Sequence, residues 1–389
     1  MRCLRQLNGH DIPSLISTME IASCFTTESP VLVHVPTEKG HGLPCAATHA
    51  YRMHFSMPFD PITGAGASPT IPGQTYATVA ASELAAIMTI DDAVTVLTPG
   101  TPYASGLEVL KDLFPTRVID CGMAEAHTVS MAAGLAMGGR KPVICIQGTF
   151  LQRAWDQVLH DVCSLDLPVT FLVVRSGFAG YDSETHHSLW DIPVLRSFPN
   201  MQLHYAMDTQ DLRETLTQRL AHPEGPLALL TPYEPVQEPE PCIDVRYDGA
   251  GMVGISRHGT LLCLGNTLGL AHSIQERLHH GAGKDFGIAV LGRLKPFTGF
   301  DRLRRIDMPN VKPLRFVTVE EGMLAGGFGS LVAETFLDGT MPIELMRVGV
   351  PDCFVPAGAK EECAVWARMT TQQIAGDIMR RWWPEWVHK

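Results

Sequence analysis

From about residue 73 onward, short β-rich runs alternate with longer helical patterns, and this alternation constrains the fold more than any other feature. Runs rich in valine, isoleucine and leucine predict strands at 93–97, 117–121, 141–147, 169–174, 201–206 and 227–230. Helical patterns lie between them at 76–90, 124–137, 149–163 and 208–222, the last capped by Asp208 or Thr209. Alternation of this kind indicates a mainly parallel sheet covered by helices on both faces.

A second block with the same alternation follows a proline- and acid-rich connector at 232–244. It predicts strands at 260–264, 287–291, 314–319 and 344–348, and helices near 268–280, 327–336 and 370–382. The first 72 residues contain one predicted helix (11–21), one strand (31–36) and irregular sequence rich in His, Pro and Gly, too little for an independent domain. The predicted fold class is α/β, with two consecutive doubly wound domains, 73–241 and 242–389, preceded by a remnant of a third at 1–72.

The composition argues against several classes of function. The 389 residues carry a formal net charge of −11 and no Lys/Arg stripe interleaved with aromatics, which disfavours a nucleic-acid partner. Apolar stretches such as 168–174 are far shorter than the roughly 18 residues of a membrane helix. Arg2 and Arg5 precede no apolar run, so we expect no secretory signal and a cytoplasmic location.

The 10 cysteines form no CxxC pair, which predicts neither a zinc site nor a disulfide framework. Cys145 and Cys263 lie within apolar runs. A free cysteine in such a run is typical of a hydrophobic core.

Three polar groups follow predicted strands, where an open α/β sheet binds its ligands. The first runs from Asp120 to His127 and contains Glu125 in the opening turn of a helix. One interpretation is structural, because the helix macrodipole favours a carboxylate there. The other is chemical, with a buried carboxylate that exchanges a proton with a nitrogen atom of a ligand. Position alone favours the structural interpretation.

The second group opens the helix predicted at 149–163, where Phe150 either stacks on a planar ligand or packs in the core, as aromatics more often do. The third is a polar loop at 175–187, for which a functional interpretation is favoured. In it, Arg175 offers a fork for carboxylate or phosphate, and His186 a proton donor near neutral pH. The adjacent His186 and His187 lack a third ligand at useful spacing, so no metal site is predicted there.

A glycine cluster at 326–329 follows a strand and opens a helix. Such a turn either exposes backbone amides to a ligand or packs tightly, and tight packing is the favoured interpretation.

Taken together, these segments resemble the thiamine-diphosphate-dependent transketolase superfamily and, within it, the 1-deoxy-D-xylulose-5-phosphate synthases. The runs that carry the resemblance are MAEAH at 123–127, TFLQRAWDQVLHDV at 149–162, LPVTF at 167–171, VEE at 319–321, GGFGS at 326–330 and GVPD at 349–352. The resemblance implies a pyrimidine-binding domain at 73–241, the family's C-terminal domain at 242–389 and, at 1–72, the last part of a diphosphate-binding domain.

The resemblance also implies roles for single residues. Glu125 matches the glutamate that hydrogen-bonds the pyrimidine ring of thiamine diphosphate and drives the proton transfer that activates the cofactor. Phe150 matches the aromatic residue stacked on that ring, with Met123 nearby, and Lys39 matches a lysine near the diphosphate. Asp182 and His186 match polar groups that face the substrate, and Arg175 matches a residue that grips the acceptor phosphate. The expected catalytic residues are therefore Glu125 and His186.

Two positions depart from the family pattern. The family run Tyr-Pro-Arg-Gly, whose arginine helps to bind the acceptor phosphate, is here Thr231-Pro232-Tyr233-Glu234, and the family tyrosine before the Thr-Phe pair is Gln147. A tyrosine in place of an arginine removes a fixed cation. Both changes put glyceraldehyde 3-phosphate in doubt as the acceptor, whereas Arg175 keeps an anionic substrate plausible.

The family binds its cofactor through a metal ion, Mg²⁺, held by a Gly-Asp-Gly…Asn motif, and the 389 residues contain no Gly-Asp-Gly. We therefore expect no metal ligands in this chain and a separate partner chain that carries the motif, in a hetero-oligomer with a dimeric core. The leading hypothesis is a split synthase-like transferase, inactive as this chain alone. It would add a two-carbon unit, from pyruvate decarboxylation or a ketose, to an aldehyde-like acceptor. The alternatives are a noncatalytic paralogue that binds or regulates a full-length synthase, and a truncated piece of a larger protein.

Overall fold

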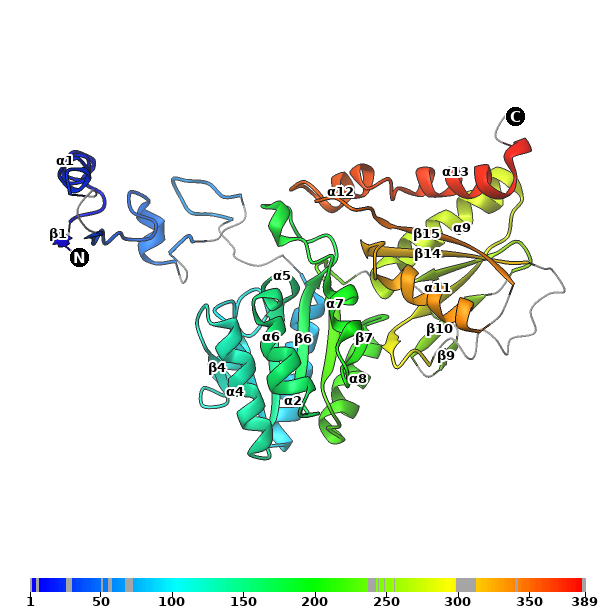
Figure 1. Ribbon diagram of the computed structural model, residues 1–389, viewed down its shortest axis with the longest axis horizontal. Helices are drawn as coiled ribbons and strands as arrows, with labels where there is room; N and C mark the ends of the chain where they lie inside the picture. Colours follow the sequence, from blue (N-terminus) through cyan, green and yellow to red (C-terminus); the bar gives the residue numbers. More distant parts are fainter. Residues whose placement is uncertain are drawn as a thin grey trace. The chain divides into compact units, whose positions relative to one another are not determined.

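The computed structural model describes residues 2–4, 7–25, 30–49, 52–54, 58–66, 73–236, 243, 245–247, 249–254, 256–298, 313–339 and 342–386. The chain divides into two compact units, Met1–Ile71 and Pro72–Lys389 (Figure 1). The predicted domain boundaries involve residues 72, 241 and 242, which lie outside the described residues.

In the unit Met1–Ile71, β1 (Arg2–Leu4) pairs in parallel with β2 (Val31–Val33). Helix α1 (Ile12–Ser23) begins after Asp11, whose side chain accepts a hydrogen bond from the Ser14 amide. A 3₁₀ turn, η1, covers Pro44–Ala47. The helix and the strand predicted here are both present, although the strand ends three residues earlier than predicted.

The unit Pro72–Lys389 contains two sheets. The first has seven described strands in the order β13-β7-β8-β6-β5-β3-β4. Their bounds are Val94–Thr98 (β3), Val118–Asp120 (β4), Lys141–Gln147 (β5), Thr170–Ser176 (β6), Gln202–Tyr205 (β7), Leu227–Pro232 (β8) and Arg293–Lys295 (β13). All neighbours are parallel except β13, which pairs antiparallel with β7.

Helices cover both faces of this sheet, as the alternation predicted (Figure 1). In β5, Val143 and Cys145 belong to one hydrophobic cluster, whereas Ile144 and Ile146 belong to another. The first cluster includes residues of α2 (Tyr76–Ile90) and α8 (Thr209–Ala221), and the second includes residues of α4 (Glu125–Met137). Burial on both faces explains the uninterrupted apolar sequence of the strand. It also raises the pKa of the Cys145 thiol to about 12, in keeping with a core cysteine.

The helix predicted at 149–163 is wrong as a single regular helix. The segment divides into α5 (Gly148–Leu151), a 3₁₀ turn η2 (Gln152–Ala154), α6 (Trp155–Gln157) and a π-helical segment η3 (Val158–Cys163). Ala154, with φ −125° and ψ 14°, leaves the helical region and interrupts the hydrogen-bond ladder. Leu151, Val158 and Val162 are nevertheless fully buried, which explains why the apolar spacing reads as one helix.

Besides β1 in the first unit, three short helices and three strands of the unit Pro72–Lys389 are additional to the predicted elements. The helices are α3 (Glu108–Leu113), α7 (Asp191–Ser197) and α12 (Lys360–Trp366), and the strands are β9 (Val245–Tyr247), β10 (Ala250–Gly254) and β13. Short 3₁₀ turns lie at Glu184–His186 (η4), Gly265–Thr267 (η5) and Pro384–Trp386 (η6).

The second sheet has the order β15-β14-β11-β12-β10-β9. The four predicted strands are β11 (Thr260–Cys263), β12 (Gly287–Leu291), β14 (Leu314–Met323) and β15 (Ile343–Val350), all mutually parallel where they pair. Helices α9 (Leu268–Ala282) and α13 (Thr371–Trp382) pack in one cluster with this sheet, and α11 (Phe328–Asp338) packs in another. The predicted fold class, α/β with two doubly wound and mainly parallel sheets, is confirmed.

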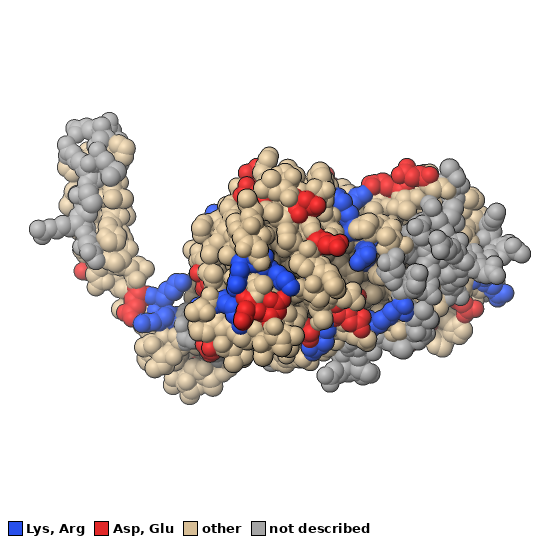
Figure 2. Space-filling model, turned by 90° about the horizontal axis from the view of Figure 1, so that it is seen from below, with Lys and Arg blue, Asp and Glu red and all other residues tan. Residues whose placement is uncertain are grey.

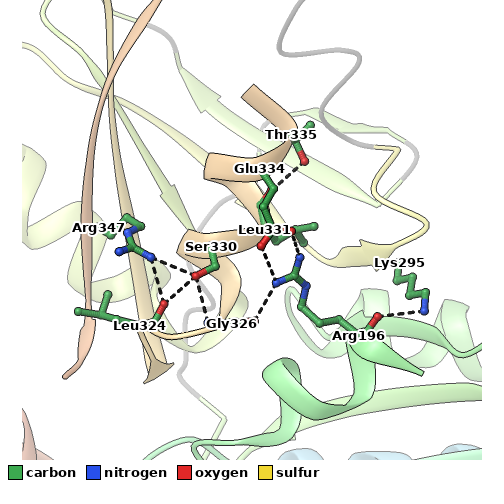
Figure 3. Close-up of polar contacts among 9 residues, drawn as sticks. All are labelled: Arg196, Lys295, Leu324, Gly326, Ser330, Leu331, Glu334, Thr335 and Arg347. Atoms are coloured by element: carbon green, nitrogen blue, oxygen red, sulfur yellow. Dashed lines mark hydrogen bonds and ion pairs between the residues drawn. The ribbon is translucent and has the colours of Figure 1, made fainter. Parts of the chain in front are cut away.

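Polar contacts join the two sheets of this unit (Figure 3). Arg196 of α7 donates from Nη1 to the carbonyl of Gly326 at 3.0 Å and also pairs with Glu334 of α11. Lys295, whose strand β13 belongs to the first sheet although it follows β12 of the second sheet in the chain, donates to the carbonyl of Arg196 at 3.0 Å. One hydrophobic cluster also contains residues of both sheets, including Ile144 and Phe316. The two sheets therefore share a core as well as polar contacts.

On the face drawn in Figure 2, basic and acidic side chains are interspersed. Within the described residues, no helix has both the length and the apolar character needed to cross a membrane.

Candidate active site

The carboxyl edge of the first sheet carries most of the residues singled out in the sequence. Glu125 follows β4, Gln147 ends β5, Arg175 lies near the end of β6 and Tyr233 directly follows β8. Phe150 lies in α5, and the remaining members, Asp182 and His186, lie in the loop between β6 and α7. This is the edge at which open parallel sheets bind ligands.

Phe150, His186 and Asp182 form one group. The His186 ring meets the Phe150 ring edge to face, with centroids 5.7 Å apart. His186 Nδ1 lies 2.9 Å from Asp182 Oδ1. The Thr149 hydroxyl donates to the carbonyl of Thr185 at 2.6 Å and so ties α5 to the loop. The aromatic ring and the imidazole–carboxylate pair predicted from separate segments therefore lie side by side.

Glu125 is the first residue of α4 and is 6% exposed. Its Oε2 lies 3.7 Å from Nε of Arg153, an exposed residue of η2. The helix-terminal position fits the structural interpretation, and the burial is what the proton-transfer interpretation requires. Met123, in the turn before α4, is 85% exposed and offers a free apolar surface beside it.

Arg175 has a left-handed backbone, with φ +63°, and its side chain is buried. The guanidinium carbon lies 4.0 Å from the centroid of the Tyr233 ring, and Tyr233 stacks on Tyr181 with centroids 6.2 Å apart. Nε of Arg175 is buried and has no hydrogen-bond partner. A non-glycine residue at positive φ with an unpaired buried donor is a strained arrangement typical of functional sites.

A partly buried charge cluster lies beside Tyr233 in the chain. Nζ of Lys360 lies 2.5 Å from Glu234 Oε2 and 2.9 Å from Glu321 Oε1. Burial alone lowers the pKa of Lys360, but Glu321 and Glu234 outweigh it and hold the lysine charged. Glu321 also accepts from the amide of Phe178 in the loop after β6, at 3.3 Å. The second sheet thus contributes side chains to the surroundings of the β6 loop.

A buried carboxylate also holds together the two ends of the loop between β6 and α7. Asp191, the first residue of α7, accepts hydrogen bonds from the hydroxyls of Ser176 and Ser188, each at 2.8 Å. Burial raises its pKa to about 6, although both serines oppose the shift. A Cβ placed on Gly148 would lie 2.0 Å from the Ser188 hydroxyl oxygen. Only glycine fits where α5 begins.

The glycine cluster at 326–329 is packed tightly, as the sequence favoured. The amides of Phe328 and Gly329, which open α11, both donate to the Glu320 carboxylate at 2.7 Å. A Cβ on Gly327 would lie 2.1 Å from the carbonyl oxygen of Met323. The amides are therefore occupied by the protein itself.

Lys39 lies in the other compact unit, Met1–Ile71, and is exposed. Its neighbour Glu38 pairs with Arg52 at 2.9 Å. The assignment of Lys39 to the cofactor diphosphate stays a prediction, as do the roles assigned to the other site residues.

Sequence reasoning did not single out four residues of this edge: Tyr103, Arg153, Tyr181 and Lys360. Tyr103 follows β3, so the rule that ligands meet the carboxyl ends of strands could have found it. Arg153 and Tyr181 lie inside two of the polar segments that follow predicted strands. Lys360 carries no local signal, because its partners are distant in the sequence.

Known proteins resemble this chain in sequence and in fold. The model of the family described as "Transketolase, pyrimidine binding domain" matches residues 73–237. The 1-deoxy-D-xylulose-5-phosphate synthase of Methylacidiphilum infernorum is 34% identical over 366 residues, and that of Synechococcus sp. strain RCC307 is 35% identical over 387 residues. The chain belongs to the transketolase superfamily.

The matches cover 90% and 96% of this transketolase-superfamily chain, which spans 55% and 58% of the lengths of the two synthases. A solved split-gene transketolase, described as an inactive beta4 tetramer, is 21% identical with a TM-score of 0.69, covering 79% of this chain and 98% of its own. The transketolase of Leishmania mexicana is 15% identical with a TM-score of 0.65, covering 80% and 47% respectively. At these identities the likeness to solved structures shows a shared fold.

Proposed function

We propose that this chain is one subunit of a thiamine-diphosphate-dependent transferase that resembles 1-deoxy-D-xylulose-5-phosphate synthase. The reaction adds a two-carbon unit, released by decarboxylation of pyruvate, to an aldehyde-like acceptor. The observation that carries the proposal is that buried Glu125 and the Phe150–His186–Asp182 group lie at the same carboxyl edge of one parallel sheet. An enzyme of this class needs that combination of proton carrier, flat ring and polar substrate contacts.

The residues present fit the pyrimidine end of the cofactor. Glu125 supplies a carboxylate shielded from water, Phe150 an aromatic ring and Met123 an exposed apolar side chain. Bound there, thiamine diphosphate supplies the carbon centre that takes up the two-carbon unit. Glu125 holds and returns the proton of the ring nitrogen, and His186, oriented by Asp182, gives a proton to the acceptor oxygen.

The diphosphate and its Mg²⁺ are assigned to a separate partner chain with a Gly-Asp-Gly…Asn motif, because the 389 residues contain no Gly-Asp-Gly. The fold of a split-gene transketolase chain, described as an inactive beta4 tetramer, supports a division of this kind. In this arrangement residues 1–72 are the end of a diphosphate-binding domain, with Lys39 near the diphosphate. Residues 73–241 are the pyrimidine-binding domain and 242–389 the C-terminal domain. The chain alone is then inactive, and a hetero-oligomer with a dimeric core is the working enzyme.

The decisive experiment is to purify the full chain with such a partner and to titrate thiamine diphosphate and Mg²⁺ while following carbon dioxide release from pyruvate. We expect saturable release by the complex and none by either chain alone. Tight binding of thiamine diphosphate and Mg²⁺ by the isolated chain would contradict the division of the site. Full activity of a Glu125→Gln complex would contradict the role of that carboxylate.

A second candidate is a noncatalytic paralogue that binds or regulates a full-length synthase. The altered Gln147 and Tyr233 positions favour it, because they change contacts that the family uses for the acceptor. In that case the chain would bind a complete synthase and change its rate, and a complex with the partner would release no carbon dioxide.

A further inference from the structure

The Arg175 guanidinium is buried, and one of its donor atoms, Nε, has no hydrogen-bond partner. The side chain is 7% exposed, the Tyr233 ring covers one face of the guanidinium at 4.0 Å, and Nε is buried without a hydrogen bond. The ring covers one face, and the N–H donors lie in the plane of the group, so an anionic ligand gains hydrogen bonds by approaching in that plane. A planar carboxylate takes up this fork with two parallel hydrogen bonds.

Three tyrosines lie around this arginine. Tyr103, Tyr181 and Tyr233 all lie within electrostatic reach of Arg175. Burial raises the pKa of each tyrosine, and the positive charge of Arg175 only opposes that shift. All three hydroxyls therefore stay protonated at neutral pH and add no charge to the site. The carboxylate of Asp182 lies within the same reach of these tyrosines.

The charge of Lys360 is already compensated, so this lysine does not provide a second cation. Lys360 is neutralised by Glu234, the residue after Tyr233, and by Glu321. Glu321 lies against the β6 loop, because a Cβ on Gly177 would lie 2.7 Å from its Oε2. Two carboxylates against one lysine leave this cluster negative. In these surroundings a phosphate dianion meets about twice the repulsion that a monoanion meets, and among the described residues named here Arg175 is the cation that would oppose it.

Resting on the function proposed above, we propose that the acceptor is a carbonyl compound bearing a single carboxylate, bound in the plane of the Arg175 guanidinium, and not a phosphate ester. Cleavage of the bond to the pyruvate carboxylate releases carbon dioxide. The electron pair left on the two-carbon unit forms a carbon–carbon bond to the acceptor carbonyl carbon, and the acceptor oxygen takes one proton. The acceptor carboxylate is unchanged, and the product is a hydroxyketone acid.

Two nonreacting three-carbon probes, D-glycerate and glycerol 3-phosphate, test the anion preference by calorimetry on the full chain, alone and with its partner. We expect glycerate to bind at least about 10-fold more tightly, since a charge-assisted fork contributes at least that factor. Arg175→Lys keeps the charge but removes the fork, so it should weaken glycerate binding about 10-fold or more. Arg277→Lys, at an exposed position of α9, is the matched control and should change neither affinity.

Tyr233→Arg adds a second cation and should shift the preference at least about 10-fold toward glycerol 3-phosphate. Equal or tighter binding of glycerol 3-phosphate by the unmodified chain overturns the proposal, and so does binding of neither probe or an unchanged glycerate affinity in Arg175→Lys. Carbon dioxide release from pyruvate is measured on the same samples. If glycerate binds but no carbon dioxide is released, the transferase function is rejected while the carboxylate-binding site is retained.

Discussion

Nε of Arg153 lies 3.7 Å from Oε2 of Glu125, although the arginine side chain is 68% exposed and that of the glutamate only 7%. The pair joins a solvated charge on η2 to a shielded charge at the start of α4. Because the arginine is mostly in water, its charge is strongly screened and contributes little to stability. The glutamate, in contrast, is shielded from water, which is what the proposed proton exchange with a ligand requires.

Glu125→Gln should abolish turnover without unfolding the protein. The amide has the same shape but cannot carry the proton, so carbon dioxide release by the complex should fall about 10²- to 10⁴-fold. The midpoint of chemical unfolding should change little. Glu276→Gln, at an exposed position of α9, is the control and should leave both quantities unchanged. A Glu125→Gln complex with a rate within a few-fold of the unmodified one would rule out a proton-carrying role.

Gly148→Ala should destabilise the fold by about 2–3 kcal/mol, because the new Cβ would lie 2.0 Å from the Ser188 hydroxyl oxygen and 2.6 Å from an Asp191 carboxylate oxygen. The matched control is Gly134→Ala in the interior of α4, where a Cβ would meet nothing within 4 Å. That change should stabilise the protein by about 0.5–1 kcal/mol, because alanine is the better helix former. Urea unfolding measures the unfolding free energy of both variants. Equal values would show that Ser188 and Asp191 can move aside at little cost and would contradict the prediction.

Lys360→Met should cost about 1–3 kcal/mol of unfolding free energy, because it leaves the partly buried Glu234 and Glu321 carboxylates without their cation. Adding Glu234→Gln and Glu321→Gln should recover most of the loss. Lys111→Met, on the exposed side of α3, should have almost no effect. Denaturant titration measures all three variants. A Lys360→Met protein as stable as the Lys111→Met control would mean that water reaches the cluster.

Stability should fall as pH rises from about 4.5 to about 7. Burial raises the pKa of Glu320 to about 7 from an ordinary value of 4.5, despite the opposing hydrogen bonds from the Gly329 and Phe328 amides. Between those values the folded state holds a proton that the unfolded state has released, so each step upward in pH favours unfolding, by up to about 3 kcal/mol in all.

Glu320→Gln cannot titrate, and its unfolding free energy should change less between about pH 5 and pH 8 than that of the unmodified protein. Asp191, with its pKa raised to about 6 by burial, should leave a residual decline of the same sign at the lower end of that range. Glu361→Gln, at an exposed position, should keep the original slope. An unaltered slope in Glu320→Gln would assign the pH dependence to other groups.

The alternation of strands and helices predicted both sheets because their strands are buried on two faces, and such strands carry continuous apolar runs. β5 and β11 are examples, with every residue of β11 buried. The position of Phe150, Asp182 and His186 at one edge also followed from the sequence, since parallel strands end at the same side.

Other features had no local signal. In the pairing of β13 with β7, His204 lies opposite Arg293, and no residue pattern in either strand predicts this pairing. The Lys360 cluster draws on β14, α12 and the segment after β8, so only the folded chain brings its charges together. Arg175 was singled out from its chemistry, but its left-handed backbone and its tyrosine cover depend on the packing around β6.

The pairing of β13 with β7 has a consequence for how the polypeptide can be divided. A polypeptide ending after β8 would leave the hydrogen-bonding groups of β7 open on the outer side of the first sheet. It would also expose the face that Ile144 shares in one cluster with Phe316. The edge that carries the proposed site therefore depends on residues more than fifty positions beyond the last strand of its own sequence block, and the two sheets should be inherited, expressed and unfolded together.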